Sequence, residues 1–117
     1  IKYKKNAELN HNLGFEYGVD DNRYYKKYNN GLLEMWGSVV IDKSSGYGTI
    51  TFPMDYANKA FRVFATQCYN SSAVPVMICS AQQQSTSTCI IYGRTHDGKT
   101  PSVNTTVWWN SIGYWKV

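Results

Sequence analysis

The sequence predicts an all-β fold, an antiparallel β-sandwich of about seven strands that follows a short non-globular N-terminal neck. Three observations support this prediction. A chain of 117 residues, 43% of them hydrophobic and 15% aromatic, suits one packed domain and not a disordered polypeptide. From residue 24 onward, short runs rich in β-branched and aromatic residues alternate with Gly, Asn and Pro. No segment has the caps and the 3.6-residue apolar period of a long helix.

Residues 1–23 are predicted to form the neck. They are polar, rich in Lys and Asn, and show no sustained apolar period of either 2 or 3.6 residues. Four large apolar side chains in this segment could anchor it against a partner surface: Leu9, Leu13, Phe15 and Tyr17. The chain opens at Ile1 with no Met, so we expect it to be a piece of a longer protein.

The first predicted strands form a hairpin over residues 24–28 and 32–41. Asn29-Asn30-Gly31 lies between them, and Asn and Gly tolerate the positive φ angles of a tight turn. Residues 47–52 alternate between apolar and polar and end at Pro53, which has no N–H to donate to a neighbouring strand. Further strands are predicted over residues 76–81 and 88–92.

Two predicted strands carry apolar residues on both faces. Residues 61–69 are apolar at odd and even positions, as expected of a strand that is covered on both sides. In an extended strand over residues 106–117, Trp109 lies on one face and Trp108 and Tyr114 on the other. Since one small domain can bury only one such face in its core, the second face predicts contact with a neighbouring subunit.

The net charge of +4 comes entirely from the second half of the chain. Residues 1–55 contain seven Lys or Arg and seven Asp or Glu, whereas five cations after residue 55 are opposed by Asp97 alone. This excess suits an anionic partner such as an acidic polysaccharide. The cations are too scattered for the basic stripe of a nucleic-acid-binding protein, and no apolar run approaches the roughly 20 residues that span a bilayer. We therefore expect no nucleic-acid partner and no membrane insertion.

The residues contain no catalytic pattern, so we expect no enzyme and no cofactor. Glycoside hydrolysis normally uses two carboxyl groups about 5 to 9 Å apart, and Asp97 is the only acid after Asp55. It would need an acid from the first half or from another subunit. His11 and His96 belong to no metal motif, although threefold symmetry could still gather three copies of one histidine around an ion.

The three cysteines are predicted to be small buried hydrophobic residues of a protein made in a reducing cytoplasm. An odd number cannot pair completely within one chain, and their spacings match no metal or redox motif. They are Cys68, Cys79 and Cys89.

Three short sequence motifs follow one another along residues 24–117. They are Y-x-K-x-x-N-G-L-L-x-x-W-G at residues 25–37, T-x-T-F-P at residues 49–53 and W-x-S-I-G-Y at residues 109–114. Together they resemble the C-terminal domain of bacteriophage tail-fibre proteins, which opens with an N-G-L-x-x-x-W-G strand and closes with a W-x-A-I-G strand. The chain departs from that pattern at three positions, where the family often has Pro, Gln and Ala: Asn29, Met35 and Ser111.

The resemblance implies a receptor-binding tip domain, residues 24–117, on a homotrimeric fibre that binds the bacterial cell surface and starts host attachment. Residues 1–23 would be the neck from the longer fibre. The implied partners are two further copies of the chain, the rest of the tail fibre and a bacterial surface glycan. The protein would belong to the virion and be made in the cytoplasm of the bacterial host. Two alternatives stay open: a structural trimerisation or capping domain with the receptor site elsewhere, and a hydrolase of surface glycans.

Ligand-binding residues are predicted in the polar loops of the second half. Residues 66–106 contain 19 Ser, Thr, Asn or Gln among 41 residues, and such side chains match the hydroxyl groups of sugars. Residues 93–101 are the first choice for the recognition loop, and residues 69–72 and 82–87 come next. Trp36 and Trp109 are assigned to the structure of the domain. The predicted contact residues, two of them cations and one a ring to stack on a sugar, are Arg94, His96, Lys99, Tyr69 and Asn70.

Overall fold

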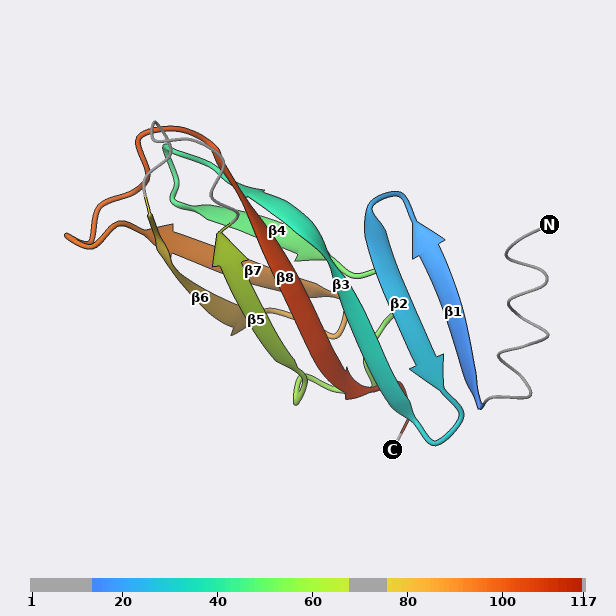
Figure 1. Ribbon diagram of the computed structural model, residues 1–117. Helices are drawn as coiled ribbons and strands as arrows, with labels where there is room; N and C mark the ends of the chain where they lie inside the picture. The colour runs from blue at the N-terminus through green and yellow to red at the C-terminus, as the bar shows by residue number, and fades with distance from the viewer. Residues whose placement is uncertain (1–13, 68–75, 117) are drawn as a thin grey trace.

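The computed structural model describes residues 14–67 and 76–116. It confirms the antiparallel all-β sandwich: a five-stranded sheet, ordered β1-β2-β3-β8-β5, packs on a three-stranded sheet, ordered β4-β7-β6 (Figure 1). No helix in these two segments is long and apolar enough to cross a bilayer. The strands are β1 Phe15–Asp20, β2 Arg23–Tyr28, β3 Leu32–Ile41, β4 Tyr47–Thr51, β5 Arg62–Gln67, β6 Ile78–Gln83, β7 Thr88–Arg94 and β8 Thr105–Tyr114.

The hairpin of β2 and β3 is confirmed. Gly31 has a φ of 106°, which only glycine adopts without strain. The Asn30 side chain accepts a hydrogen bond of 3.1 Å from the Leu32 backbone N–H, which closes the turn.

The neck does not extend to residue 23, because residues 15–20 form an eighth strand. β1 pairs with β2 along its whole length, from Phe15 opposite Tyr28 to Asp20 opposite Arg23. Asp21, whose φ is 62°, makes the tight turn between the two strands, and aspartate is one of the few residues that tolerate this conformation. The apolar side chains at 15, 17 and 19 point to one face of this edge strand. Leu9 and Leu13 lie outside the described residues.

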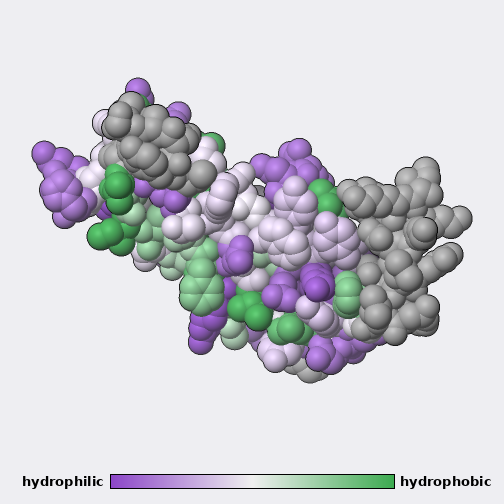
Figure 2. Space-filling model, viewed as in Figure 1, coloured by the Kyte–Doolittle hydropathy of each residue, from purple (hydrophilic) through white to green (hydrophobic). Residues whose placement is uncertain are grey.

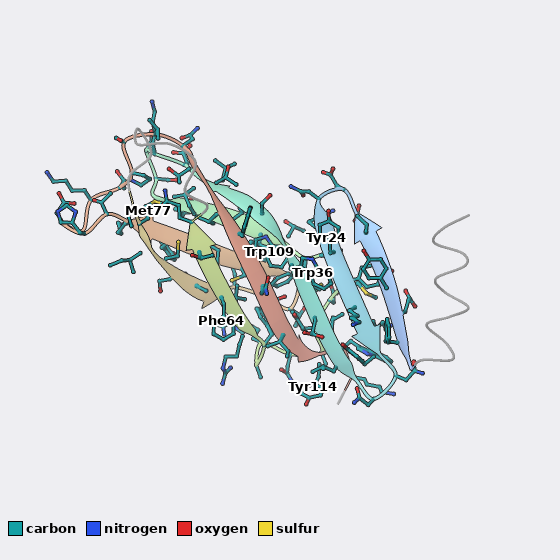
Figure 3. The ribbon with its side chains drawn as sticks, viewed as in Figure 1. Tyr24, Trp36, Phe64, Met77, Trp109 and Tyr114 are labelled. Atoms are coloured by element: carbon teal, nitrogen blue, oxygen red, sulfur yellow. The ribbon has the colours of Figure 1, made fainter. Side chains whose placement is uncertain are left out.

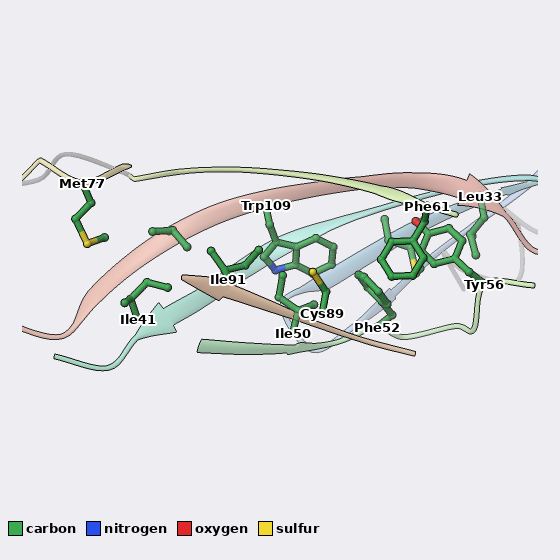
Figure 4. Packing of buried hydrophobic residues seen from close by; sticks show 12 residues of the cluster. Leu33, Ile41, Ile50, Phe52, Tyr56, Phe61, Met77, Cys89, Ile91 and Trp109 are labelled. Atoms are coloured by element: carbon green, nitrogen blue, oxygen red, sulfur yellow. The ribbon is translucent and has the colours of Figure 1, made fainter. Parts of the chain in front are cut away.

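The core fills the space between the two sheets, and Trp109 lies near its centre with 1% of its surface exposed (Figure 4). The Phe52 ring meets Trp109, Tyr56 and Phe61 edge to face, at centroid distances of 5.6, 5.3 and 5.2 Å. Such arrangements suit the charge distribution of aromatic rings. Other fully buried members of this cluster are Leu33, Met35, Ile41, Ile91, Val107 and Cys89.

The cysteine prediction is confirmed for Cys89, which is fully buried and unpaired. Burial raises the pKa of its thiol to about 11, so the neutral form is held at physiological pH. Cys79 is half-buried and burial raises its pKa as well. Cys68 lies outside the described residues.

β8 has the alternation that the sequence predicted. Thr105, Val107, Trp109 and Ser111 are buried against the three-stranded sheet, whereas the residues between them are exposed. β5 was predicted to be covered on both faces. Within this single chain its outward face is not covered, since Phe64 on that face is 67% exposed.

Candidate functional site

The turn between β7 and β8 at residues 95–99, the 95–99 turn, is closed by its own hydrogen bonds. The Thr95 N–H donates to the Lys99 carbonyl at 2.8 Å, and the Gly98 N–H donates to the Thr95 carbonyl at 2.9 Å. The Asp97 carboxylate accepts from the Thr95 hydroxyl and, at 3.4 Å, from the Lys99 N–H. The hydroxyl bond is the main cause of a lowered pKa at Asp97. The turn is therefore a defined structure that carries an ionised carboxylate.

Arg94 lies at the base of the turn and is half-buried. Its Nη1 donates to the carbonyl of Gly46 at 2.7 Å and to that of Gly93 at 2.8 Å. The centre of its guanidinium lies 5.9 Å from the centroid of the Tyr92 ring. Arg94 therefore joins the start of β4 to the end of β7, a structural role in addition to the ligand contact that the sequence predicted.

The structure brings three of the five predicted contact residues to one end of the sandwich. His96 and Lys99 are exposed there, and the Lys99 side chain is 81% exposed. In Figure 1 this end, at the left, lies opposite the β1 edge. The other two predicted contacts, Tyr69 and Asn70, lie outside the described residues.

Of the two loops predicted next, residues 69–72 lie outside the described residues, and residues 82–87 lie at the opposite end of the three-stranded sheet. Ile78 pairs with Arg94 at one end of β6 and β7, and Gln83 pairs with Cys89 at the other. The Gln83 side chain donates to the Phe61 carbonyl at 2.7 Å, which ties this end to the five-stranded sheet. The 95–99 turn and the loop at residues 82–87 therefore cannot share one small site.

A second exposed surface covers the outward side of the five-stranded sheet. Strand pairing places Tyr24, Trp36, Asn110 and Phe64 in one row across β2, β3, β8 and β5. The rings of Tyr24 and Trp36 are stacked, 5.7 Å apart and 8° from parallel. We call this surface the aromatic face; its large side chains include Tyr24, Trp36, Phe64, Trp108, Ile112 and Tyr114. Figure 3 labels four of them: Tyr24, Trp36, Phe64 and Tyr114.

The aromatic face is uneven and largely apolar. Trp108, 57% exposed, separates a hollow of about 330 Å³ beside Trp36 from one of about 430 Å³ beside Phe64, and Asn110 lines both. Figure 2 views this side and shows pale and green residues over much of its middle, with single hydrophilic residues between them. Trp109 lies in the core as the sequence predicted, whereas Trp36 belongs to this outward surface.

Only part of the aromatic face could be predicted from the sequence. The alternation in β8 identified Trp108 and Tyr114, because neighbours in one strand follow from a two-residue period. The contributions of Trp36 and Phe64 depend on the strand order, with β8 between β3 and β5. No local signal in the sequence predicts that order.

Two carboxylates, Asp42 and Asp97, lie at the end of the sandwich that carries the 95–99 turn. Asp42 accepts hydrogen bonds from the backbone N–H groups of Ser45 and Ser44 at 3.0 and 2.7 Å, and these bonds lower its pKa. The pKa of Asp97 is lowered too, whereas the acid of a glycosidase needs a raised pKa. Within residues 14–67 and 76–116, no three His, Cys, Asp or Glu side chains gather to hold a metal ion.

Solved structures of pyocin tail fibres have a similar fold. An R2 pyocin fibre of P. aeruginosa matches with a TM-score of 0.66 and 18% identity, over 85% of this chain and 25% of that one. An N-truncated R1-type pyocin tail fibre matches with a TM-score of 0.58 and 20% identity, over 92% of this chain and 95% of that one. The chain thus spans about a quarter of the R2 fibre fragment. At this level of identity the likeness shows the fold alone.

No curated protein matches the chain. The family described as tail fiber protein gp53-like, C-terminal, matches residues 27–114, which is most of the chain and covers seven of the eight strands wholly or in part. This chain belongs to the family of gp53-like tail fibre C-terminal domains.

Proposed function

We propose that this tail fibre domain attaches to the bacterial cell surface by binding a surface polysaccharide, without catalysis, and so starts infection. The observation that carries the proposal is the exposed 95–99 turn, which presents His96 and Lys99 from a rigid β-scaffold. Loops on such scaffolds commonly carry binding functions. Lys99 and the neighbouring Arg94 would attract an acidic polysaccharide, because cationic surfaces raise the local concentration of anionic ligands.

The proposal is tested with the isolated domain and cells of the phage host. The wild-type domain is expected to bind the cells and to block phage adsorption. Replacing His96 and Lys99 together by alanine should weaken cell binding by about tenfold and flatten its dependence on salt, because attraction between exposed charges is screened by ions. Arg94 is left intact in this test, since its bonds to the Gly46 and Gly93 carbonyls make it part of the fold.

The matched control is Lys59→Ala, which removes the same formal charge from an exposed position before β5. It should bind cells like the wild type. If the His96 and Lys99 double variant also binds at full strength across the salt series, the 95–99 turn is not the contact. If the wild-type domain neither binds cells nor blocks adsorption, the attachment function itself is wrong.

The second candidate is a domain that trimerises or caps the fibre, and the aromatic face favours it. Phe64 and Trp108 are 67% and 57% exposed, and soluble monomers seldom expose large contiguous apolar surfaces. A homotrimer that covers this face is compatible with attachment through the 95–99 turn. A domain that only caps the fibre would form the trimer but leave phage adsorption unchanged. Loss of surface polymer on incubation with the protein would instead reveal a hydrolase.

A further inference from the structure

The outward side of the three-stranded sheet differs in chemistry from the aromatic face. Strands β4, β6 and β7 contain no Asp or Glu, and Arg94 is their only charged residue. Besides Arg94, the outward side chains are two tyrosines, the isoleucines Ile78 and Ile90, and five that carry a hydroxyl or an amide: Thr49, Thr51, Ser80, Gln82 and Thr88. Tyr47 pairs with Tyr92, and Tyr92 with Ser80, in one row across the three strands. The next row holds Thr49 and Gln82 on either side of Ile90.

Tyr92 is held in place by three contacts on this exposed side. Its hydroxyl donates to the Gln82 side-chain carbonyl at 2.9 Å. The Tyr47 ring lies 5.9 Å away, tilted by 53°. The Arg94 guanidinium approaches the Tyr92 ring and is itself fixed by its hydrogen bonds to the Gly46 and Gly93 carbonyls. A side chain that is already ordered loses little conformational entropy when a ligand binds.

We propose that Tyr47, Tyr92, Gln82 and Arg94 form a binding platform for an acidic polysaccharide. We call it the tyrosine platform. The proposal deepens the proposed function and rests on it, because it adds a second contact for the same class of ligand. The rings supply flat apolar surfaces for the C–H faces of sugars, and the Gln82 amide can bond to sugar hydroxyls. The charge of Arg94, with no carboxylate in these strands to oppose it, favours a ligand that carries carboxylate or phosphate groups.

The dimensions of the platform suit a chain of sugars. Neighbouring strands lie about 4.8 Å apart, so the row from Tyr47 to Ser80 is about 10 Å long, comparable to a disaccharide. Arg94 ends β7 and leads directly into the 95–99 turn. A longer polysaccharide could therefore run from the tyrosine platform past Arg94 to His96 and Lys99.

A simpler role for the two tyrosines is to stabilise the sheet, as cross-strand aromatic pairs commonly do. Ring packing alone does not account for the hydrogen bond from the Tyr92 hydroxyl to Gln82 on the solvent side. A sheet-stabilising pair needs only apolar packing between the two strands, which leucine would largely preserve. A sugar platform needs the aromatic ring, so phenylalanine would replace tyrosine much better than leucine.

The test uses the assembled protein and an array of purified bacterial capsular and O-chain polysaccharides, both acidic and neutral. The wild type is expected to bind acidic members of the array. Tyr92→Leu and Tyr47→Leu should each weaken that binding by about tenfold, as is common for aromatic residues at the centre of a site. Tyr92→Phe should stay within about threefold of the wild type. Tyr17→Leu, which removes a half-buried tyrosine from β1, is the matched control and should bind normally.

The site is then mapped by nuclear magnetic resonance with oligosaccharides cut from a bound polysaccharide. Backbone amide signals of β4, β6 and β7 should shift on titration. If Tyr92→Leu and Tyr47→Leu bind like the wild type while the His96 and Lys99 double variant loses binding, the platform is wrong and the proposed function stands. If the wild type binds cells but no polysaccharide on the array, the ligand class proposed for the platform is wrong. If it binds neither, both proposals fail.

Discussion

At the scale of single residues, a buried pair of hydroxyl groups joins three segments that are far apart in the sequence: β3, β8 and the segment between β4 and β5. The Tyr56 hydroxyl donates to the Ser111 hydroxyl at 2.7 Å, and Ser111 donates to the Met35 carbonyl at 3.2 Å. Tyr56 is 3% exposed and its ring stacks on Phe61 at 4.6 Å. Burial raises the pKa of Tyr56, so its hydroxyl keeps its proton and acts as a donor.

Ser111→Ala is therefore expected to cost about 1–3 kcal/mol of unfolding free energy, because it leaves the buried Tyr56 hydroxyl without its acceptor. Tyr56→Phe should cost less, since Ser111 keeps its bond to Met35. The double variant should be more stable than the sum of the two losses predicts, because no unpaired hydroxyl remains on residue 56. Urea unfolding of the four proteins measures this. Simple additivity would show that the two hydroxyls are not coupled in the folded domain.

The sequence predicts Arg94 as a ligand contact, but it does not predict the structural role of this residue. A charged residue beside a turn with Gly and Pro is correctly expected near the surface. Its bonds to Gly46 and Gly93 exist because β4 pairs with β7, more than 40 residues along the chain. That long-range pairing has no local signal, so the structural role of Arg94 could not be predicted.

At the scale of strands, prediction succeeded where the signal is local. β3 and β8 have long alternating patterns, and the turn between β2 and β3 has Asn and Gly where positive φ is needed. β1 was missed because its alternation covers only Phe15, Tyr17 and Val19 and is surrounded by polar residues. As an edge strand it gains its order from pairing with β2, which a short window of sequence does not contain.

The close approach of β3 and β4 at Gly48 gives a test at this scale. A Cβ atom at Gly48 would collide with the Val40 carbonyl oxygen, and a Val39 side-chain carbon would lie only 3.0 Å away. The obstacle includes backbone, so relief requires the two strands to separate. Gly48→Ala should therefore destabilise the domain by about 1–3 kcal/mol. Thermal unfolding measures the effect, with Thr49→Ala on the exposed side as the control, and equal stability of the two variants would contradict the close approach.

At the scale of the whole molecule, the domain is a flat plate with principal extents of 49 × 30 × 16 Å and two different broad sides. One side is the aromatic face, and the other is the polar surface of the three-stranded sheet. A plate this thin has little core in proportion to its surface. Covering the aromatic face with other copies would add buried apolar area and leave the polar side and the 95–99 turn accessible to a ligand.

This asymmetry predicts that the domain forms a homotrimer through the aromatic face, as the resemblance to tail fibres implies. Trp108→Glu and Phe64→Glu should each dissociate the assembly, because a carboxylate buried in an apolar contact lacks both water and a partner. Light scattering should give three times 13.3 kDa for the wild type and lower masses for both variants.

Thr49→Glu places the same charge on the opposite, polar side, where Thr49 is exposed, and should leave the trimer intact. Its effect separates a specific contact from a general effect of added negative charge. A wild-type domain that stays at 13.3 kDa at micromolar concentration would refute the trimer. Dissociation by Thr49→Glu alone would instead place the contact between copies on the three-stranded sheet. That result would also conflict with the tyrosine platform, since one surface cannot be buried between subunits and bind a polysaccharide at the same time.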